Sequence, residues 1–358
     1  MKKIISLLAV AGLVLTASAQ KTEKQVATLQ HGDKTTVFYG IDAFKQAYDA
    51  AADTLDVITL SSGEFNVPSI SKSIAIYGAG FENDTVTGTP RTYLNGGLSL
   101  RPADAQDEDG NTIKGGKHVN GVHIEGVYVN GNIRADNNND VPIHNLSVVK
   151  CRIQTLAFHV NSYDCAIRQS YLDGYIGAYL YGSDSKKKTS NLYISNNYIA
   201  NKASSTTYVA FYNFDSSSTI YIDHCVMRNN SMLGAFRYTN NIIYSGSLST
   251  GAEGSNNIFI GVGGTSSSVD GSWYGMNNQG VWAAEGEDGS YAENKDFALK
   301  YPAKFVGTDG TEIGLHGGVY AWNKIPSIPR ITECTIDTEN VSNGTLKVSI
   351  KAEAQTKE

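Results

Sequence analysis

The stretch NLYISNNYIAN, residues 191–201, alternates apolar and polar residues until two asparagines interrupt the alternation. Leu192 and Ile194 stand two positions apart, as the inward side chains of a strand do, and Ile199 restores the pattern. The same frame recurs along the chain. It has an apolar residue, a second two positions later, a small residue three further on, and an apolar residue two beyond that. The frame predicts a repeated strand followed by a bend.

Ten segments fit this frame, and each has Ile, Leu or Val at the third position. These residues are Leu60, Ile76, Leu100, Ile124, Val148, Ile167, Ile194, Ile222, Ile243 and Ile260. Their spacing averages about 22 residues and equals 24 for three successive steps. A repeat of this length with one short strand is typical of a solenoid. We therefore predict an all-β fold, a single-stranded right-handed parallel β-helix of about ten coils with one aliphatic column inside.

The small position of the frame defines a second column, which explains Asn197. Its members are Gly63, Ala79, Ala103, Val127, Cys151, Ser170, Asn197, Cys225, Gly246 and Gly263. An inward asparagine at a bend can bond the backbone of the next coil, so we interpret Asn197 as structural.

The cysteines follow from the same geometry. Cys151 and Cys225 lie three coils apart, on the order of 14 Å at strand spacing, which is too far for a disulfide. Cys165 falls in another column, and Cys334 lies in the tail. We predict free thiols, buried as small apolar groups.

The N-terminus has the pattern of a secretory signal peptide. Lys2 and Lys3 precede an uncharged, mostly apolar run, and Ala17-Ser18-Ala19 provides a small-residue cleavage site before Gln20. We expect residues 1–19 to be removed and the protein to be secreted, to the periplasm or to the cell surface. Loss of the two lysines changes the net charge from −6 to −8. Such a charge argues against nucleic acid as a partner, and no later segment is long enough for membrane insertion.

The solenoid is expected to span residues 20–325. GIDAFKQAYDAA (40–51) places Ile41, Phe44 and Tyr48 on one helical face, which predicts a helix capping the first coil. TEIGLHGGVY (311–320) fits the frame once more. Residues 326–358 form a C-terminal β-extension, either a hairpin over the last coil or the start of a small β-module. No motif is assigned to residues 266–300.

Three stretches carry a family resemblance: DTLDVITLSSGEFNVPSISKSIAIYGAG (53–80), NLYISNNYIAN, and DFALKYPAKFVGTDGTEIGLHGG (296–318). Over residues 40–325 the chain resembles the pectate-lyase-like right-handed parallel β-helix superfamily, and more narrowly exported bacterial β-helix proteins of unassigned function. The resemblance implies a range of functions: polysaccharide lyases, polyuronide hydrolases, carbohydrate-binding proteins and adhesins.

The penultimate position of the frame predicts an outward row. Tyr128, Arg152, Tyr171 and Tyr198 occupy it on four consecutive coils. Glu125, Lys150, Arg168, Asp223 and His224 run beside this row. Tyrosine faces with interspersed cations suit stacked sugar rings and bound uronate or sulfate, so Tyr128, Arg152, Tyr171, Tyr198 and Asp223 are the expected ligand-binding residues. The alternative is that tyrosines favour strands and stack between coils for stability.

Candidate catalytic residues come from two patterns. Four Ala-aromatic pairs predict Phe158, Tyr179, Phe211 and Phe236 inside the coil and His159, Tyr212 and Arg237 outside it. If the outward three converge, they form an acid/base and carboxylate-binding set. In the resembling superfamily a lyase often uses Lys or Arg as base, and Lys150 and Arg168 are candidates for that role.

Paired carboxylates for a hydrolase are absent from adjacent coils, since Glu125 and Asp223 lie four coils apart. RADNNNDVP (134–142) could hold Ca²⁺ through Asp136 and Asp140, although a polar turn is the commoner interpretation. No other cofactor is indicated.

The expected function is therefore an exported β-helix protein that binds polysaccharide, an acidic glycan, through the Tyr/Arg row. Two alternatives stay open: a polysaccharide lyase or glycoside hydrolase acting on a uronate-containing polymer, and a structural envelope protein or adhesin.

Overall fold

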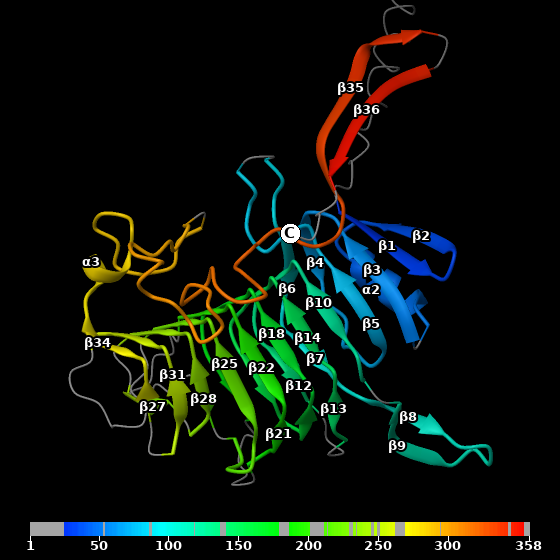
Figure 1. The fold of residues 1–358 in the computed structure, drawn as a ribbon. Helices are drawn as coiled ribbons and strands as arrows, with labels where there is room; N and C mark the ends of the chain where they lie inside the picture. The colour runs from blue at the N-terminus through cyan, green and yellow to red at the C-terminus, as the bar shows by residue number, and fades with distance from the viewer. Residues whose placement is uncertain are drawn as a thin grey trace, which may run out of the picture.

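The computed structural model describes residues 25–52, 54–85, 88–117, 119–136, 141–178, 186–200, 211–212, 214–228, 232–233, 235–244, 247–248, 251–261, 269–293, 295–342 and 345–353. The predicted signal peptide lies outside these residues. Strands dominate them, and the described helices are α2 (Ala43–Ala50) and α3 (Asn278–Val281). The all-β prediction is confirmed (Figure 1).

The largest sheet, called sheet A, has twelve strands. In spatial order they are β2 (Lys34–Tyr39), β1 (Val26–His31), β3 (Thr54–Leu60), β5 (Ser73–Tyr77), β10 (His123–Glu125), β14 (Ser147–Val149), β18 (Ala166–Arg168), β22 (Leu192–Ser195), β25 (Ile220–Asp223), β28 (Arg237–Thr239), β31 (Glu253–Ser255) and β33 (Val269–Asp270). Strand β1 pairs antiparallel with β2 and β3, and from β3 to β33 all pairs are parallel.

Two further parallel sheets follow the same progression. Sheet B has ten strands: β34 (Trp273–Met276), β32 (Ile258–Ile260), β29 (Ile242–Tyr244), β26 (Val226–Met227), β23 (Tyr198–Ile199), β19 (Tyr171–Leu172), β15 (Arg152–Ile153), β11 (Tyr128–Val129), β6 (Thr92–Asn95) and β4 (Gly63–Asn66). Sheet C has five: β24 (Phe211–Tyr212), β20 (Ile176–Gly177), β16 (Leu156–Phe158), β12 (Ile133–Ala135) and β7 (Leu98–Leu100).

The remaining strands form small sheets. Parallel ones are β13 (Ile143–His144), β17 (Ser162–Tyr163) and β21 (Thr189–Ser190), and the pair β27 (Met232–Leu233) and β30 (Ser247–Leu248). Antiparallel hairpins are β8 (Ala103–Gln106) with β9 (Thr112–Lys117), and β35 (Arg330–Ser342) with β36 (Thr345–Glu353).

The chain visits the sheets in a fixed order, from sheet A to sheet B and then, where its strands are present, to sheet C. We call one such passage a circuit; β14, β15 and β16 make one. Among the described residues a circuit therefore holds at least two strands, not the one strand that the 22-residue frame predicted. Leu98 and Leu100 of sheet C form an inward apolar pair of the same spacing, and Ile258 and Ile260 of sheet B form an outward one, so the frame could not tell the sheets apart.

This changes the membership of the aliphatic column. Six of its ten predicted residues are in register in sheet A, namely Ile76, Ile124, Val148, Ile167, Ile194 and Ile222. Ile58, not Leu60, pairs with Ile76. Leu100 belongs to sheet C, and Ile243 and Ile260 belong to sheet B. All the predicted residues are nevertheless buried.

The bend between sheets A and B explains both asparagines of the opening stretch. Asn196 has φ of 54°, in the left-handed region that asparagine tolerates better than most residues. Asn197 is completely buried, accepts the Ser170 N–H at 2.9 Å and donates to the Ile167 carbonyl at 2.9 Å. The predicted structural role of Asn197 is confirmed. Two asparagines outside the predicted column, Asn241 and Asn257, make equivalent bonds two and three circuits on.

Three cysteines are free and buried, as predicted: Cys151, Cys165 and Cys225. Burial raises the pKa of each thiol to about 12. The side chain of Cys334 is outside the described part of the structure. Ala103 does not join the small column, because it begins the β8–β9 hairpin, and residues 246 and 263 lie outside the described residues.

The predicted cap is present, with an addition. Helix α2 buries Phe44 and Tyr48 against the core, although Ile41 precedes the helix and is 44% exposed. The β1–β2 hairpin extends sheet A beyond β3, so the first parallel strand has a hydrogen-bonded neighbour on its outer side.

Residues 277–329, described except for residue 294, form a segment that we call the strap. In Figure 1 it runs in yellow and orange from the end of β34 back across the upper ends of the sheet A strands. The prediction that residues 311–320 form another coil is wrong, because they lie in the strap. Ile313 and Leu315 match the frame because they pack on the outside of sheet B with Ile242 and Phe305.

The C-terminal hairpin β35–β36 projects away from the body and pairs with no other described strand (Figure 1). The strap ends near the early circuits, where Pro326 lies against Gly80 and Gly126. The hairpin that follows the strap therefore begins there. The alternative in which the hairpin covers the last coil is therefore wrong.

Candidate functional site

The predicted Tyr/Arg row lies on the outer face of sheet B. Tyr128, Arg152, Tyr171 and Tyr198 are in register on successive strands, as expected. Tyr171 and Tyr198 are each only 1% exposed, however, so the prediction that they face solvent is wrong. They point out of the circuits into a second hydrophobic cluster, which the strap closes from outside.

Residues of the strap contact both tyrosines through ring stacking and a hydrogen bond. The Tyr291 ring stacks on Tyr171 with 3.9 Å between centroids, and the Tyr198 hydroxyl donates to the Gly289 carbonyl at 2.7 Å. Phe297 lies 5.2 Å from the Tyr198 ring centre. Burial raises the pKa of both phenols above their ordinary value. Gly289, Tyr291 and Phe297, from a segment to which the sequence assigned no motif, cover Tyr171 and Tyr198.

The rest of the row is also engaged within the chain. The Arg152 guanidinium sits 4.7 Å from the Tyr128 ring centre and 4.9 Å from that of Tyr171, and it pairs with Asp173 at 3.4 Å. Arg91 covers Tyr128 as well, at 5.0 Å. These contacts support the alternative interpretation of the row, in which tyrosines stack between circuits for stability.

The strap is attached along the bend between sheets A and B. Six bend residues on consecutive circuits have φ between 49° and 60°: Lys150, Gln169, Asn196, His224, Asn240 and Asn256. Each reaches a strap atom, and the strap partners run in the opposite direction along the sequence, namely Ile325, Ala321, Leu315 with Gly317, Thr311, Thr308 and Val306. The left-handed bend directs each side chain outward to the strap.

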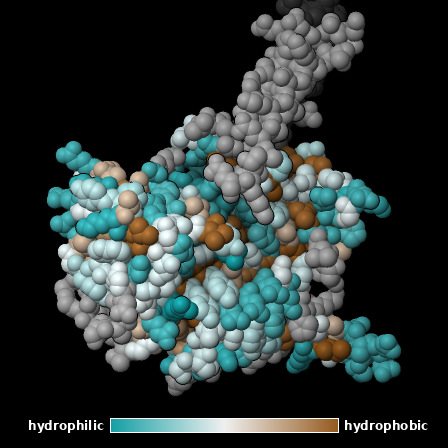
Figure 2. All heavy atoms as spheres, in the orientation of Figure 1, coloured by the Kyte–Doolittle hydropathy of each residue, from teal (hydrophilic) through white to brown (hydrophobic). Residues whose placement is uncertain are grey.

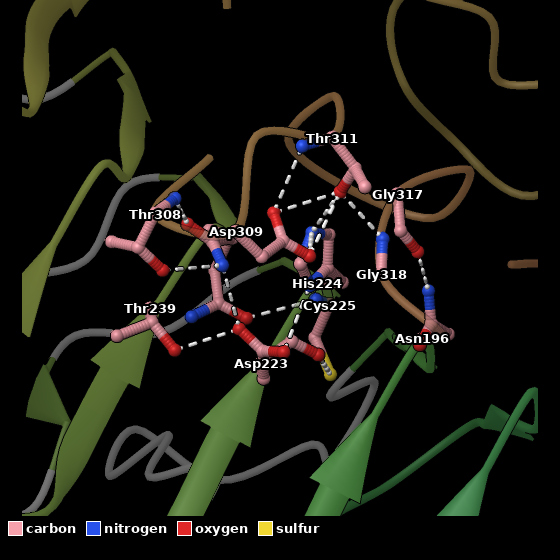
Figure 3. Close-up of polar contacts among 12 residues, drawn as sticks. Asn196, Asp223, His224, Cys225, Thr239, Thr308, Asp309, Thr311, Gly317 and Gly318 are labelled. Carbon is pink, nitrogen blue, oxygen red and sulfur yellow. Dashed lines mark hydrogen bonds and ion pairs between the residues drawn. The ribbon is translucent and has the colours of Figure 1, made fainter. Parts of the chain in front are cut away.

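Figure 3 shows the most polar part of this attachment. The imidazole of His224 is completely buried, with Nδ1 2.8 Å from Asp223 Oδ2 and Nε2 3.2 Å from Thr311 Oγ1. The Thr311 hydroxyl contacts Asp309 at 2.9 Å and accepts the Gly318 N–H at 2.7 Å. One ring nitrogen contacts Asp223 of sheet A and the other contacts Thr311 of the strap, so His224 acts as a structural link between them.

Asp223 lies between this link and the open face of sheet A. Its Oδ1 accepts from Thr239 Oγ1 at 2.7 Å and from Asn240 Nδ2 at 3.0 Å, and its side chain is 39% exposed. Burial opposes its ionisation, but the hydrogen bonds from His224, Thr239 and Asn240 together lower the pKa of the carboxyl. Asp223 is thus a fixed, ionised acceptor at the edge of an accessible face.

The outer face of sheet A is not covered by the strap beyond its edge. Tyr193, Tyr221, Arg237 and Glu253 are in register on four consecutive strands. Tyr193 is 46% exposed, and its ring is stacked on that of Tyr221 with 5.0 Å between centroids and 11° between planes. In Figure 2, which has the orientation of Figure 1, hydrophilic and near-neutral residues dominate this view, and the hydrophobic ones form small groups.

A parallel row, nearer the strap, contains Arg168, Ser195 and Asp223 in register. The ring of the strap residue Tyr320 lies over the Arg168 guanidinium, with 4.2 Å from Cζ to the ring centre. Together with Tyr320, the two rows place three tyrosines, two arginines, a serine and two carboxylates on one side of sheet A. This arrangement is the candidate binding site.

Sequence reasoning missed Tyr193 and Tyr221, although the signal was present. Both occupy the second position of the frame, in LYISNNYI and IYIDHCVM, and an outward residue lies there just as at the penultimate position. Reading only the penultimate position selected the face that the strap covers.

The other candidate residues lie elsewhere. His159 follows β16 of sheet C, whereas Arg237 is in sheet A, so the predicted set with Tyr212 does not converge. Tyr212 has no described side chain, and Tyr179 is not described, but Phe158 and Phe211 are buried as predicted and Phe236 packs against the core.

His159 has a different partner. Arg101 Nη2 lies 2.9 Å from Asp136 Oδ2, and His159 Nδ1 lies 3.6 Å from Asp136 Oδ1. These residues follow β7, β12 and β16, so they form a charged trio on consecutive circuits at the end of sheet C. Burial lowers the pKa of His159, which favours the neutral imidazole near pH 7.

Lys150 is buried beneath the strap, where Nζ donates to the Ile325 carbonyl at 2.7 Å and lies 3.9 Å from Glu125. Burial lowers the pKa of Lys150, while Glu125 opposes the shift. Asp140, the second predicted calcium ligand, lies outside the described residues. Within the described ranges, no group of three or more His, Cys, Asp or Glu residues is arranged to hold a metal ion.

Comparisons of this chain with protein-family models, with curated proteins and with solved structures gave no match. Among the residues that the structure describes, no helix is both long and apolar enough to cross a membrane.

Proposed function

We propose that the chain is an exported right-handed parallel β-helix protein, similar to the pectate-lyase-like superfamily, that binds polysaccharide. Three parallel sheets visited in a fixed order, with inward asparagines at one bend, support the architecture. The N-terminal pattern of residues 1–19 supports export.

The binding face we propose is the open side of sheet A and not the Tyr/Arg row of sheet B. The observation that carries this proposal is the stacked pair Tyr193 and Tyr221, of which Tyr193 is 46% exposed. Aromatic side chains offer an apolar face together with a polar hydroxyl, which suits the C–H face and hydroxyl groups of a sugar ring. Asp223, already fixed in its ionised form, can accept from sugar hydroxyls beside the rings.

Alanine substitution tests this face directly. Tyr193→Ala and Tyr221→Ala should each weaken binding to a responsive polysaccharide by roughly three- to tenfold, because one stacked ring is worth about 0.5–1.5 kcal/mol. The measurement is affinity electrophoresis or calorimetry against a panel of neutral and uronate-containing polysaccharides. Tyr301→Ala is the control, since Tyr301 is 50% exposed but belongs to the strap.

Unchanged binding in the double variant Tyr193→Ala/Tyr221→Ala would remove sheet A as the binding face. If the wild-type protein bound none of the panel, the envelope or adhesin alternative would replace polysaccharide binding.

A second candidate function is a polysaccharide lyase or glycoside hydrolase, and the Arg101–Asp136–His159 trio favours it. Asp136 can orient the imidazole as a general base while arginine attracts a uronate carboxylate. The trio predicts unsaturated uronate products, or new reducing ends, on incubation with polyuronides, and their loss in His159→Gln. Absence of both products with and without Ca²⁺ would rule out this reaction for those substrates.

A further inference from the structure

The side chain of Arg168, on the sheet A face, is not fully hydrogen-bonded within the described part of the chain. Its Nε is buried and has no hydrogen-bond partner among the described residues. The hydroxyl of Ser195, its neighbour in register on the next strand, is likewise buried and without a partner. Two unpaired polar groups on adjoining strands are costly unless another molecule completes them.

Neighbouring carboxylates do not supply this partner. Glu125 and Asp223 occupy the same row, each two strands away from Arg168 on opposite sides. Glu125 is bound by His123 at 3.1 Å and by the Ser327 N–H at 2.6 Å, and Asp223 is bound by His224, Thr239 and Asn240. Both acids are satisfied by other donors, so the described part of the chain gives the guanidinium no anionic partner.

Tyr320 is the strap residue whose ring contacts Arg168. Its ring lies over the guanidinium, yet the side chain is 43% exposed and follows Val319, which is 90% exposed. The ring can turn into solvent without disturbing either hydrophobic cluster, because Tyr320 belongs to neither.

We infer that Arg168 and Ser195 form a binding subsite for one oxyanion, a carboxylate or a sulfate carried by a sugar, with Tyr320 as a movable cover. The anion accepts from Arg168 Nε and from the Ser195 hydroxyl when the Tyr320 ring turns away. This inference rests on the proposed function, since it makes the glycan on the Tyr193–Tyr221 pair an acidic one. A guanidinium matches either anion through parallel N–H donors.

Monomeric probes test the subsite independently of polysaccharide binding. The arginine Nε–H signals are followed by ¹⁵N NMR while sodium glucuronate, its neutral methyl ester, or sodium sulfate is added. We expect the Arg168 signal, identified by its loss in Arg168→Lys, to shift saturably with glucuronate and not with the ester. Sulfate in a separate titration distinguishes a sulfated from a uronate ligand. Arg91, which precedes β6 of sheet B and pairs with Glu293 at 3.1 Å, serves as the internal control and should not saturate.

Variants separate this inference from the proposed function. Arg168→Gln should weaken binding of an acidic polysaccharide at least about tenfold and leave a neutral one unchanged, because it removes a charge-assisted hydrogen bond. Tyr320→Ala should strengthen glucuronate binding about two- to fivefold, since the cover no longer competes. No saturable shift at Arg168, or equal loss for acidic and neutral polymers, would overturn the subsite. If Tyr193→Ala still weakened polysaccharide binding in that case, sheet A would remain the binding face and only the anion subsite would be discarded.

Discussion

Sheets A and B both present tyrosines to the outside, yet Tyr171 and Tyr198 of sheet B are shut off from solvent and Tyr193 of sheet A is not. Tyr198 of sheet B is 1% exposed, and Tyr193 of sheet A is 46% exposed, although they are five residues apart on one circuit. The difference comes from the strap, whose Gly289 and Phe297 cover Tyr198. An outward side chain of a repeat protein is therefore available to a ligand only where no later segment returns over it.

The largest expected difference between the two faces is in stability. Tyr198→Ala should cost about 3–5 kcal/mol of unfolding free energy, because it leaves a cavity between sheet B and the strap. Tyr193→Ala should cost only about 0.2–1 kcal/mol, because it removes one exposed cross-strand stack on Tyr221 and leaves no buried cavity. Urea unfolding followed by circular dichroism measures both. Similar losses in the two variants would mean that the faces are not distinguished by the strap.

The next effect concerns the attachment of the strap. His224→Asn keeps a residue that tolerates the left-handed bend but is too short to reach Thr311, and we expect it to cost about 1–3 kcal/mol. Hydrogen exchange should increase at the strap amides of Gly314 and Gly318, which are bonded near the link, while that of α2 stays unchanged. A uniform increase over the whole chain would indicate general destabilisation and contradict a local link.

The sequence predicted the features that depend on neighbouring circuits, but not the burial of tyrosines by the distant strap. The inward alternation, the Asn197 bonds, the free thiols and the α2 cap depend on local pattern and nearest-neighbour stacking, and these were predicted. The assignment of Leu100 and Ile243 failed because strands of different sheets share one pattern. The burial of Tyr171 depends on Tyr291, 120 positions later, in a segment without periodicity. A repeat frame relates only neighbouring circuits, so it does not predict a contact between Tyr171 and a residue so far along the sequence.

A smaller effect is expected from pH at the edge of the sheet A face. The folded-state pKa of Asp223 is lowered, so its contribution to stability is present above the unfolded value, roughly 4, and is lost as pH falls through the folded pKa. Asp223→Asn should therefore lower Tm at pH 6, and the gap to wild type should narrow below about pH 4. Because Asp223 is 39% exposed, solvent screening keeps the gap small. A gap that widened in acid would reverse the assigned direction.

The smallest effect should come from removing the C-terminal hairpin. Strands β35 and β36 pair with each other and with no other described strand, whereas the strap that covers Tyr198 ends before them, at residue 329. A chain shortened to residue 329 should thus keep its unfolding free energy within about 0.5 kcal/mol. The hydrogen exchange of the Gly314 amide should also be unchanged. If the truncation exposed Tyr198 to a solvent quencher of tyrosine fluorescence, the cover over sheet B would depend on the hairpin and not on the strap alone.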